Sequence, residues 1–409
     1  MSVRPPRDSP NRDVVRLGVI GLGAVAQAVH LPLIDRLPDR FRLTALCDLS
    51  PGLLRAIGER YRVPEEARWT DADALFASGA VDAVLILSSG SHGAVAAAAL
   101  SAGLDVLCEK PLAATLAEAD ALAALAGTDS GGGSATRPRL QLGYMKLYDP
   151  AVVAAREWID ARGSGRSGVT LRSIEVTVLH PPSGPQLAHA RLLPPPSDVP
   201  ATALAAITAE ADALAEAALG PAPADLRRLY ANVLLGSVVH ELALIRSFAG
   251  DPVAIDDADA WPSGAWPPSV AITGRLPGSA RFAIRWHYLE GFPAYREEVR
   301  LIFDDAVVEL LFPSPYLLHA PTRLTITDSD GGAYRDTSRG SYAEAFEEQL
   351  LAFHALVTDG TRPVAGIAEG RADIVTCQLM ASRFAERNGW PLGGEAAAAP
   401  MPGAAALAT

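Results

Sequence analysis

Cysteine is scarce in this sequence, and its spacing excludes two classes of structure. The 409 residues include three cysteines, Cys47, Cys108 and Cys377, which lie far apart. They form no zinc-type spacing and no disulfide framework. Two of them stand inside apolar runs, where a reduced thiol packs as a small hydrophobic group. A reducing, cytoplasmic setting is therefore expected.

Positive charge is also in deficit. The 35 Lys and Arg residues face 47 Asp and Glu, which gives a formal net charge of −12. A general affinity for nucleic acid or for anionic membrane surfaces needs clustered basic residues, so neither partner is expected. The N-terminal arm has no apolar core of the kind found in secretory signals. No apolar run is long enough to indicate a membrane span.

Apolar residues, in contrast, suffice for a large buried core. Hydrophobic residues make up 49% of the chain and charged residues 20%, as in ordinary globular proteins of two domains. We expect a first domain at 14–147 and a second at 148–392, with a Pro- and Ala-rich insertion at 181–226. The arm at 1–13 and the tail at 393–409 are expected to be disordered.

Up to residue 147, short apolar runs alternate with helical patterns. Because strands that read as continuous apolar runs are covered on both faces, the pattern predicts an α/β fold with a doubly wound parallel sheet of the Rossmann type. A Gly- and Ser-rich stretch at 127–138 is expected to be a flexible loop. The predicted strands are 14–23, 41–48, 81–89, 104–111 and 139–146, and the predicted helices are 24–37, 53–61 and 92–103.

The second half of the chain has the pattern of an α+β domain. Several strands follow one another, and their alternation of apolar and polar residues predicts a large, mainly antiparallel open sheet. The apolar stretch 232–246, with His240 at its middle, is predicted to be a helix. The other predicted helices are 151–163, 201–218, 341–360 and 366–389, and the predicted strands are 171–180, 269–276, 280–289, 295–305, 306–312 and 323–329.

A glycine turn follows the first predicted strand. Gly21 permits a tight turn, Gly23 lets the backbone approach a pyrophosphate, and Ala26 allows close packing of helix on strand. The amide groups of Ala24 and Val25 open the next helix, where free N–H groups and the helix dipole favour an anion. The motif at this position predicts a dinucleotide-binding site.

The acidic partner expected for that site is Asp48, 22 residues after Ala26 at the end of the second strand. Its carboxylate would accept hydrogen bonds from the adenosine ribose and would repel a 2′-phosphate. NAD is therefore favoured over NADP, although Arg55 leaves NADP open. The alternative role for Asp48 is that of a turn or capping residue.

Two further strand ends carry polar residues. Glu109, Lys110 and Pro111 close the fourth strand, and strand ends at the carboxyl edge of such a sheet face the ligand crevice. Lys110 near a nicotinamide would lower the pKa of a substrate hydroxyl; its alternative role is a solvated ion pair with Glu109. After the third strand, Ser88 and His92 are candidates for contact with the cofactor, with helix capping as the alternative for His92.

At this point the sequence resembles the Gfo/Idh/MocA family, named after glucose–fructose oxidoreductase and inositol dehydrogenase. The motifs that carry the resemblance are GLGAVA with Asp48, the block from SHGAVAAAAL to CEKPLA, GYMKLYDP, the His240 helix and the helix at 341–360. The resemblance implies an N-terminal Rossmann domain and a C-terminal domain whose open sheet makes the oligomer contact. It also implies hydride transfer between NAD(P) and a sugar, cyclitol or related molecule by a homodimer or homotetramer.

The resemblance assigns roles to individual residues. Lys110 matches the family's active-site lysine, and His240 matches its usual general acid/base. Lys146 matches a basic position that faces substrate, with Tyr148 and Tyr295 as further substrate candidates. Tyr288, Arg296, His180 and His189 are weaker candidates. No metal ligand is expected.

One departure from the family pattern lies in the His240 helix. Family members commonly carry an Asp one turn before the histidine, and this chain has Gly236 there, which leaves room for a bulky substrate. Glu241 lies about a quarter-turn around the helix and is a poor substitute. SSGSH at 88–92 also lacks the family's usual Pro-Asn. The alternatives kept open are an imine reductase, a glycoside-cleaving enzyme and a nucleotide-sensing regulator without turnover, and for His240 the role of a packed core histidine.

Overall fold

The computed structural model describes residues 14–126, 138–163 and 170–398, and these divide into two compact units. Unit 1 takes in the chain up to Gly143 together with Ala190–Leu214 and Gln349–Arg371; unit 2 takes in Tyr144–His189, Ala215–Glu348 and the residues from Ala372 on. The expected boundary after residue 147 is thus close to the observed one. The expectation that 148–392 forms one domain differs from the structure, because two later segments join unit 1.

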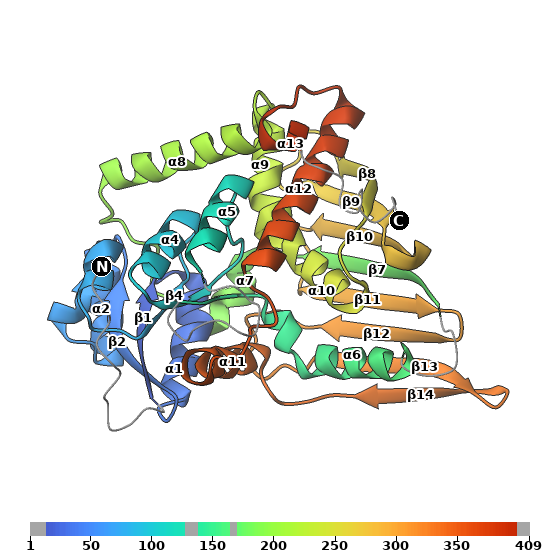
Figure 1. Cartoon of the computed structure of the whole chain (residues 1–409), viewed down its shortest axis with the longest axis horizontal. Coiled ribbons are helices and arrows are strands. Elements are labelled where there is room, and N and C mark those ends of the chain that lie inside the picture. The colour runs from blue at the N-terminus through green and yellow to red at the C-terminus, as the bar shows by residue number, and fades with distance from the viewer. Residues whose placement is uncertain (1–13, 127–137, 164–169, 399–409) are drawn as a thin grey trace. The chain divides into compact units, whose positions relative to one another are not determined.

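Unit 1 is built on a six-stranded sheet in which every neighbouring pair is parallel. The order is β3-β2-β1-β4-β5-β6, the strand order of dinucleotide-binding Rossmann folds. The sequence predicted five of these strands and missed the two-residue β3. Figure 1 labels β2, β1 and β4 beside one another in this sheet. The strands are β1 (Val15–Ile20), β2 (Phe41–Cys47), β3 (Arg68–Trp69), β4 (Ala83–Ile86), β5 (Asp105–Cys108) and β6 (Leu140–Leu142).

Helices flank the strands of this sheet and explain the apolar runs of the strands. Leu17, Val84 and Val106 on three strands are completely buried, as expected for a parallel sheet covered on both faces. Thr115 and Glu118 form a reciprocal capping box at the start of α5. The helical elements are η1 (Ala26–His30, a π-helical turn), α1 (Leu31–Arg36), α2 (Pro51–Tyr61), η2 (Glu65–Ala67), α3 (Ala72–Ala77), α4 (Gly93–Ser101) and α5 (Leu116–Leu125).

Unit 2 is built on an eight-stranded sheet of order β14-β13-β12-β11-β7-β10-β9-β8. All neighbouring pairs are antiparallel except β7 and β10, which are parallel. The predicted mainly antiparallel sheet is confirmed, and β8 and β14 were missed. The strands are β7 (Leu171–His180), β8 (Ala254–Trp261), β9 (Ser269–Arg275), β10 (Arg281–Tyr288), β11 (Arg296–Phe303), β12 (Ala306–Phe312), β13 (Arg323–Asp330) and β14 (Ala333–Arg339).

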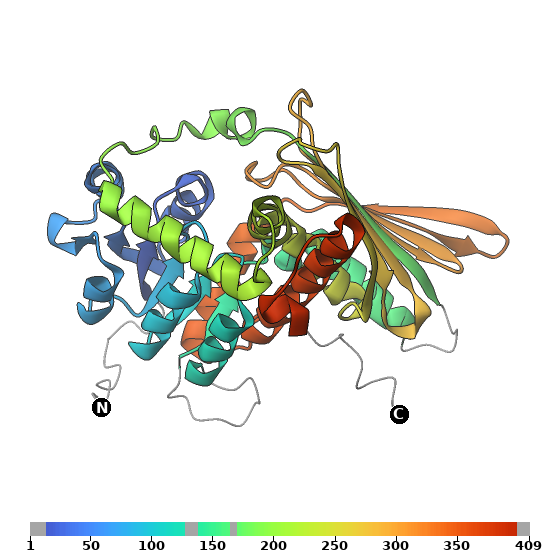
Figure 2. The same cartoon turned by 90° about the horizontal axis from the view of Figure 1, so that it is seen from above.

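Helices lie against one face of this sheet. Figure 2, seen along the sheet, shows green α6, yellow-green α10 and red α12 on the same side. The residues that face them, such as Ile174, Ile284 and Val299, are completely buried, whereas their neighbours along each strand are partly exposed. The helical elements of unit 2 are η3 (Met145–Tyr148), α6 (Pro150–Gly163), α9 (Ala224–Leu229), η5 (Tyr230–Val238, a π-helix), α10 (Val239–Ala249), η6 (Pro277–Ser279) and most of α12 (Ile367–Asn388). The helix α11 (Ala345–Asp359) begins in unit 2, but most of it belongs to unit 1.

The continuous helix Ala224–Ala249 is long and apolar enough to cross a membrane by length and composition, and 67% of its apolar window is buried in the structure. The expectation that no apolar run reaches that length is therefore wrong. Burial of this extent is what the core helix of a soluble protein shows.

The expected insertion at 181–226 consists of α7 (Ser183–Leu187), η4 (Ala188–Ala190) and α8 (Ala201–Leu219), followed by the start of α9. Part of it, Ala190–Leu214, belongs to unit 1. The tail expected to be disordered begins instead with the short helix α13 (Gly394–Ala398), so that expectation is wrong for these five residues. The arm at 1–13, the loop at 127–137 and the rest of the tail lie outside the described residues.

Candidate functional site

The glycine turn of unit 1 has the geometry that a diphosphate requires. Gly21 adopts φ +87°, and a Cβ there would lie 2.6 Å from the backbone nitrogen of Ser88, so only glycine fits. A Cβ on Gly23 would meet nothing within 4 Å, and both Gly23 and Ala24 are exposed. The surface at the helix start is thus open to a ligand, while Ala26 is fully buried against the sheet. These features fit a bound dinucleotide.

Asp48 lies at this turn. Its Oδ2 accepts a hydrogen bond from the Leu22 nitrogen at 2.8 Å, and its Oδ1 accepts one from the Ser50 nitrogen at 2.9 Å. The carboxylate therefore ties the end of β2 to the glycine turn, which is the capping role that the sequence left open. Each oxygen of a carboxylate has a second lone pair, so these contacts leave acceptor capacity for a ribose hydroxyl.

His92 joins the loops that follow β4 and β5. Its Nε2 lies 2.7 Å from the carbonyl oxygen of Ser88, and its Nδ1 lies 2.6 Å from that of Pro111. The side chain is buried and makes no capping hydrogen bond to α4, so the alternative of helix capping is wrong. Because Lys110 directly precedes Pro111, the imidazole fixes the backbone beside the candidate catalytic lysine.

Glu109 faces the interior of unit 1, where the sequence did not predict a partner. Its Oε1 lies 3.1 Å from Nε2 of His30, a residue that is fully buried at the end of η1. Burial alone would raise the pKa of Glu109, but the hydrogen bond from His30, then the charges of His30, Lys110 and His92, lower it overall. Glu109 is itself buried, which contradicts the solvated ion pair considered for Lys110 and Glu109.

Unit 2 holds a buried ionic cluster around Lys146, which we call the Lys146 cluster: Lys146, Glu241, Glu297 and Tyr295. Nζ of Lys146 lies 3.2 Å from Oε1 of Glu241 and 2.5 Å from Oε2 of Glu297. The hydroxyl of Tyr295 donates to the same Glu297 oxygen at 2.5 Å. Lys146 comes from η3, Glu241 from α10 and Glu297 from β11, so the cluster joins three elements.

The cluster contains two carboxyl groups and one ammonium group. Burial is the largest effect on Glu241 and, with the charge of Glu297, raises its pKa to about 7, although Lys146 opposes the shift. Burial alone would lower the pKa of Lys146, but its two carboxylate partners raise it overall. Burial, followed by the charge of Glu297, raises the pKa of Tyr295 well above its usual range. Lys146 is thus a cation and Tyr295 is a neutral hydroxyl at neutral pH.

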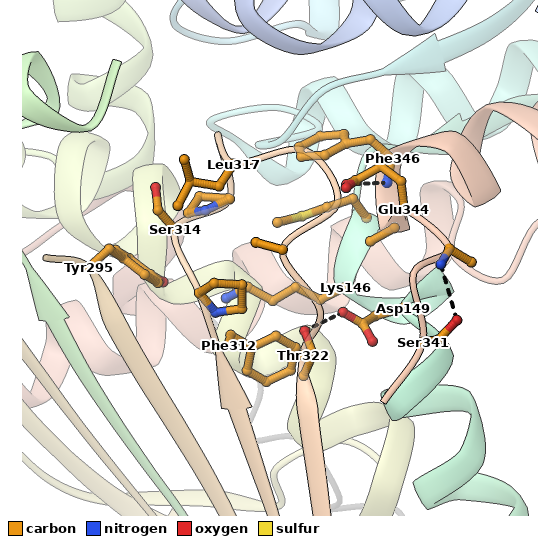
Figure 3. Close-up of a pocket in the computed structure, with 16 residues that line it drawn as sticks. Lys146, Asp149, Tyr295, Phe312, Ser314, Leu317, Thr322, Ser341, Glu344 and Phe346 are labelled. Atoms are coloured by element: carbon orange, nitrogen blue, oxygen red, sulfur yellow. Dashed lines mark hydrogen bonds between the residues drawn. The ribbon is translucent and has the colours of Figure 1, made fainter. Parts of the chain in front are cut away.

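A shallow pocket that is open to solvent lies against this cluster. Figure 3 shows Lys146 running past the ring of Phe312 towards Tyr295, with Asp149 held by a hydrogen bond from Thr322 on the other side. Four residues were predicted to contact substrate: Lys146, Tyr148, Gly236 and Tyr295. Of these, Lys146 and Tyr295 line the pocket. Its lining residues are Met145, Lys146, Asp149, Tyr295, Phe312, Pro313, Ser314, Pro315, Leu317, Ala320, Thr322, Ser341, Ala343, Glu344, Ala345 and Phe346.

Tyr148, Gly236 and His240 are not among the lining residues of this pocket. Tyr148 is buried in η3. Gly236 lies in the π-helix η5, where a Cβ would meet only the carbonyl oxygen of Ala231, at 3.4 Å, so a larger side chain would fit there. Single π-helical turns recur at functional sites.

His240 lies in the first turn of α10 and is half-buried. Its ring stands edge-on to that of Tyr144, with 6.0 Å between centroids. The Tyr144 hydroxyl donates to Asp373, which also pairs with Arg246 on α10. The carboxylate of Glu241, the next residue, binds Lys146. The Glu241 carboxylate therefore points to the Lys146 cluster and not to the His240 ring, in agreement with the prediction that Glu241 is a poor substitute for the missing Asp.

The chain is similar to known oxidoreductases. Residues 15–131 match the family model described as "Oxidoreductase family, NAD-binding Rossmann fold", GFO_IDH_MocA. The chain is 33% identical to inositol 2-dehydrogenase of Paracoccus denitrificans over 144 residues, which are 35% of this chain and 40% of that protein. It is 36% identical to inositol 2-dehydrogenase 1 of Saccharopolyspora erythraea over 152 residues, 37% and 43% of the two chains. The alignments thus span less than half the length of these curated relatives.

Solved structures show the same fold over nearly the whole chain. The aldose–aldose oxidoreductase of Caulobacter crescentus covers 91% of this chain and 98% of its own, with a TM-score of 0.66 and 19% identity. A putative NADPH-dependent oxidoreductase of Desulfitobacterium hafniense covers 92% and 97%, with a TM-score of 0.68 and 15% identity. Residues 15–131 thus match the NAD-binding domain of the Gfo/Idh/MocA oxidoreductase family, and the described chain has the fold of these solved oxidoreductase structures.

Proposed function

We propose that this protein is an NAD(P)-dependent dehydrogenase or reductase that acts on a sugar, a cyclitol or a related hydroxyl- or keto-bearing small molecule. The observation that carries the proposal is the combination of an open glycine cradle in unit 1 with a pocket in unit 2 that is lined by Lys146 and Tyr295. Relatives named inositol 2-dehydrogenase support a polyhydroxylated substrate. A role in specialised metabolism is part of the same proposal, motivated by Gly236 and the insertion.

The pocket chemistry suits hydroxyl groups. Because the Tyr295 hydroxyl donates a hydrogen bond to Glu297, its oxygen is left to accept a hydrogen bond from a substrate hydroxyl. The ammonium of Lys146 donates to substrate oxygens, and its charge is balanced by buried carboxylates. Apolar side chains such as Phe312, Leu317 and Phe346 provide surface for the carbon skeleton of a ring. A molecule that alternates C–H and O–H groups matches both parts.

When bound, the nicotinamide supplies or accepts the hydride. His240 takes the proton of the substrate hydroxyl, or returns it in the reductive direction. Nδ1 of His240 is buried, and we assign the exchange to Nε2. A positioned base of this kind contributes about 10²–10⁴-fold to the rate. Lys110 stabilises the developing alkoxide by its charge, and His92 and Pro111 hold the backbone beside it.

The proposal is tested by NADH absorbance after NAD is mixed with purified protein and a panel of inositols, aldoses and amino sugars. We expect turnover with at least one polyol, and a loss of about 10²–10⁴-fold in kcat in His240→Ala and Lys110→Ala. His287→Gln is the matched control, because His287 lies on β10 and contacts Ser269. Equal activity in all three variants would contradict the assigned roles.

Two other functions give different results in the same assay. Turnover of cyclic imines in place of alcohols would indicate an imine reductase. Tight NAD binding without turnover across the panel, together with a protein partner, would indicate a regulator that keeps the fold.

We also propose that the protein acts in the cytoplasm as a homodimer or homotetramer. Its three cysteines are free and buried, which suits a reducing compartment. The face of the unit 2 sheet opposite α6, α10 and α12 carries no helix among the described residues and is the proposed surface of self-association.

A further inference from the structure

The insertion reaches the glycine turn of unit 1. The backbone nitrogen of Leu193 donates to Oε1 of Gln27 at 2.9 Å. Gln27 is buried in η1, directly after the turn, and its Nε2 donates to the carbonyl oxygen of Leu22 at 2.8 Å. One side chain therefore holds both the glycine turn and the insertion, which fixes the start of the Pro-rich segment 193–200 beside the dinucleotide site.

Five residues further on, the same segment places a second carboxylate beside Asp48. Oδ1 of Asp198 accepts a hydrogen bond from the Ser50 hydroxyl at 2.6 Å, and Oδ2 accepts one from the Gly52 nitrogen at 2.7 Å. The nitrogen of Ser50 donates at the same time to Oδ1 of Asp48. Asp48 and Asp198 thus bind the same residue from two sides.

We infer that Asp198 is a cofactor-specificity residue: its carboxylate, delivered by the insertion, excludes the 2′-phosphate of NADP from the adenosine end of the site. The inference rests on the proposed function, in which the adenosine ribose lies at Asp48. A phosphate on the 2′-oxygen would there face two carboxylates that bracket Ser50.

The donors that Asp198 uses are those that a 2′-phosphate would need. Ser50 and Gly52 stand at the N-terminus of α2, where hydroxyl and backbone N–H groups and the helix dipole favour an anion. Asp198 already fills these donors. Its hydrogen bonds from Ser50 and Gly52, followed by the charge of Arg55, hold its pKa below the usual range, so it is ionised at neutral pH.

Arg55 was the reason for leaving NADP open. It lies on α2 close enough to act electrostatically on Asp198. The carboxylate therefore offsets a cation that would otherwise attract the 2′-phosphate. Gly52 keeps this arrangement possible, because a Cβ at that position would lie 2.8 Å from Oδ2 of Asp198.

The test compares the affinities of the full-length protein for 5′-AMP and adenosine 2′,5′-bisphosphate by calorimetry, together with the ratio of kcat/KM for NAD and NADP. In Asp198→Asn we expect the preference for 5′-AMP over adenosine 2′,5′-bisphosphate to fall about tenfold, because the substitution removes one negative charge beside the 2′-phosphate dianion. Asp198 is exposed, so raising the salt concentration should shrink the difference between wild type and variant. A merely structural role would not produce that salt dependence.

Two further variants separate charge from position. Gly52→Ala leaves every charge in place but displaces Asp198, and we expect it to weaken the preference in the same direction. Asp39→Asn removes an exposed carboxylate that precedes β2, at the opposite edge of the sheet, and should leave the preference unchanged.

The outcomes distinguish this inference from the proposed function. An unchanged preference in Asp198→Asn and Gly52→Ala, with NAD binding intact, overturns the role of Asp198 alone. A wild-type protein that binds neither nucleotide overturns both proposals.

Discussion

Lysine occurs only twice among the 409 residues, at Lys110 and Lys146, whereas the other 33 basic residues are arginine. Lys146 is buried and Lys110 is half-buried, so the chain uses arginine as its surface cation. An ammonium is a compact point charge with three rotatable donors, whereas a guanidinium is a wide planar fork. Both lysines therefore suit contacts with single oxygens in confined places, which is the role proposed for them.

Glu241 gives the Lys146 cluster a pH dependence. Its pKa is about 7 in the folded protein, against an ordinary value of 4.5. Between these values the folded protein binds more protons than the unfolded chain, so the free energy of unfolding falls as pH rises through this window. One pKa unit corresponds to about 1.4 kcal/mol, so the loss approaches about 3 kcal/mol.

Glu241→Gln should abolish the fall in the free energy of unfolding with rising pH, because glutamine resembles the protonated acid. We expect the variant to match wild type near pH 4.5 and to exceed its stability by about 2–3 kcal/mol above pH 7. Denaturant unfolding at several pH values measures the difference. Glu298→Gln, on the half-exposed side of β11, is the control and should show no such trend. A difference between Glu241→Gln and wild type that is independent of pH would contradict the assignment.

At the scale of elements, the junction between β1 and its helix is the most demanding connection in unit 1. Gly21→Ala would put a residue at φ +87° with its Cβ 2.6 Å from the Ser88 nitrogen. Gly79 also has a positive φ, +69°, but a Cβ there would meet nothing within 4 Å. We expect Gly79→Ala to lower the free energy of unfolding by about 1–2 kcal/mol. Gly21→Ala should lower it by about 3 kcal/mol or more and should abolish NAD binding. Calorimetry with NAD and denaturant unfolding check both, and equal costs would contradict the steric argument.

Elements with strong periodicity were predictable and those without it were not. β7 was predicted at its observed bounds because its alternation is clear. β14 (AYRDTSR) has exposed residues on both faces and therefore carries no period-two signal. The two-residue β3 is too short for any pattern. The π-helical register of η5 depends on hydrogen bonds of i→i+5 type, which composition does not encode.

In the candidate site, too, some features were predictable from the sequence and others were not. The glycine turn was predictable because local sequence determines its geometry, whereas the role of Lys110 stays a prediction. The Lys146–Glu241–Glu297 contacts join residues 95 and 151 positions apart, and no sequence spacing specifies such pairs. His30 with Glu109 and Asp198 with Ser50 were missed for the same reason.

At the scale of the whole molecule, the units are not continuous in sequence. Ala190–Leu214 and Gln349–Arg371 return to unit 1 after the chain has entered unit 2. The side chain of Gln141 donates to the carbonyl oxygen of Gln349, and the backbone nitrogen of Leu142 donates to that of Ala365, so the late segment is hydrogen-bonded to the edge strand β6. Composition shifts mark linkers but not such returns, which explains why a single boundary was predicted.

The last prediction concerns the face of the unit 2 sheet opposite α6, α10 and α12. Arg300 on β11 stands between Glu175 on β7 and Glu309 on β12, and its ion pair with Glu309 is nearly half exposed. Leu179, Ile302, Val307 and Leu311 lie around these charges and are partly exposed. A mixed surface of this kind suits a self-complementary interface, in which residues meet their own copies across a twofold axis.

If this face joins the proposed oligomer, Arg300→Glu should shift the protein towards monomers by at least tenfold in dissociation constant, because three carboxylates then cluster at the interface. Light scattering coupled to size-exclusion chromatography measures the mass at micromolar concentrations. Arg281→Glu, at the exposed start of β10, is the matched charge reversal and should leave the mass unchanged. A monomeric wild type would contradict the proposed assembly while leaving the dinucleotide site of unit 1 unaffected, because that site is built from unit 1 alone.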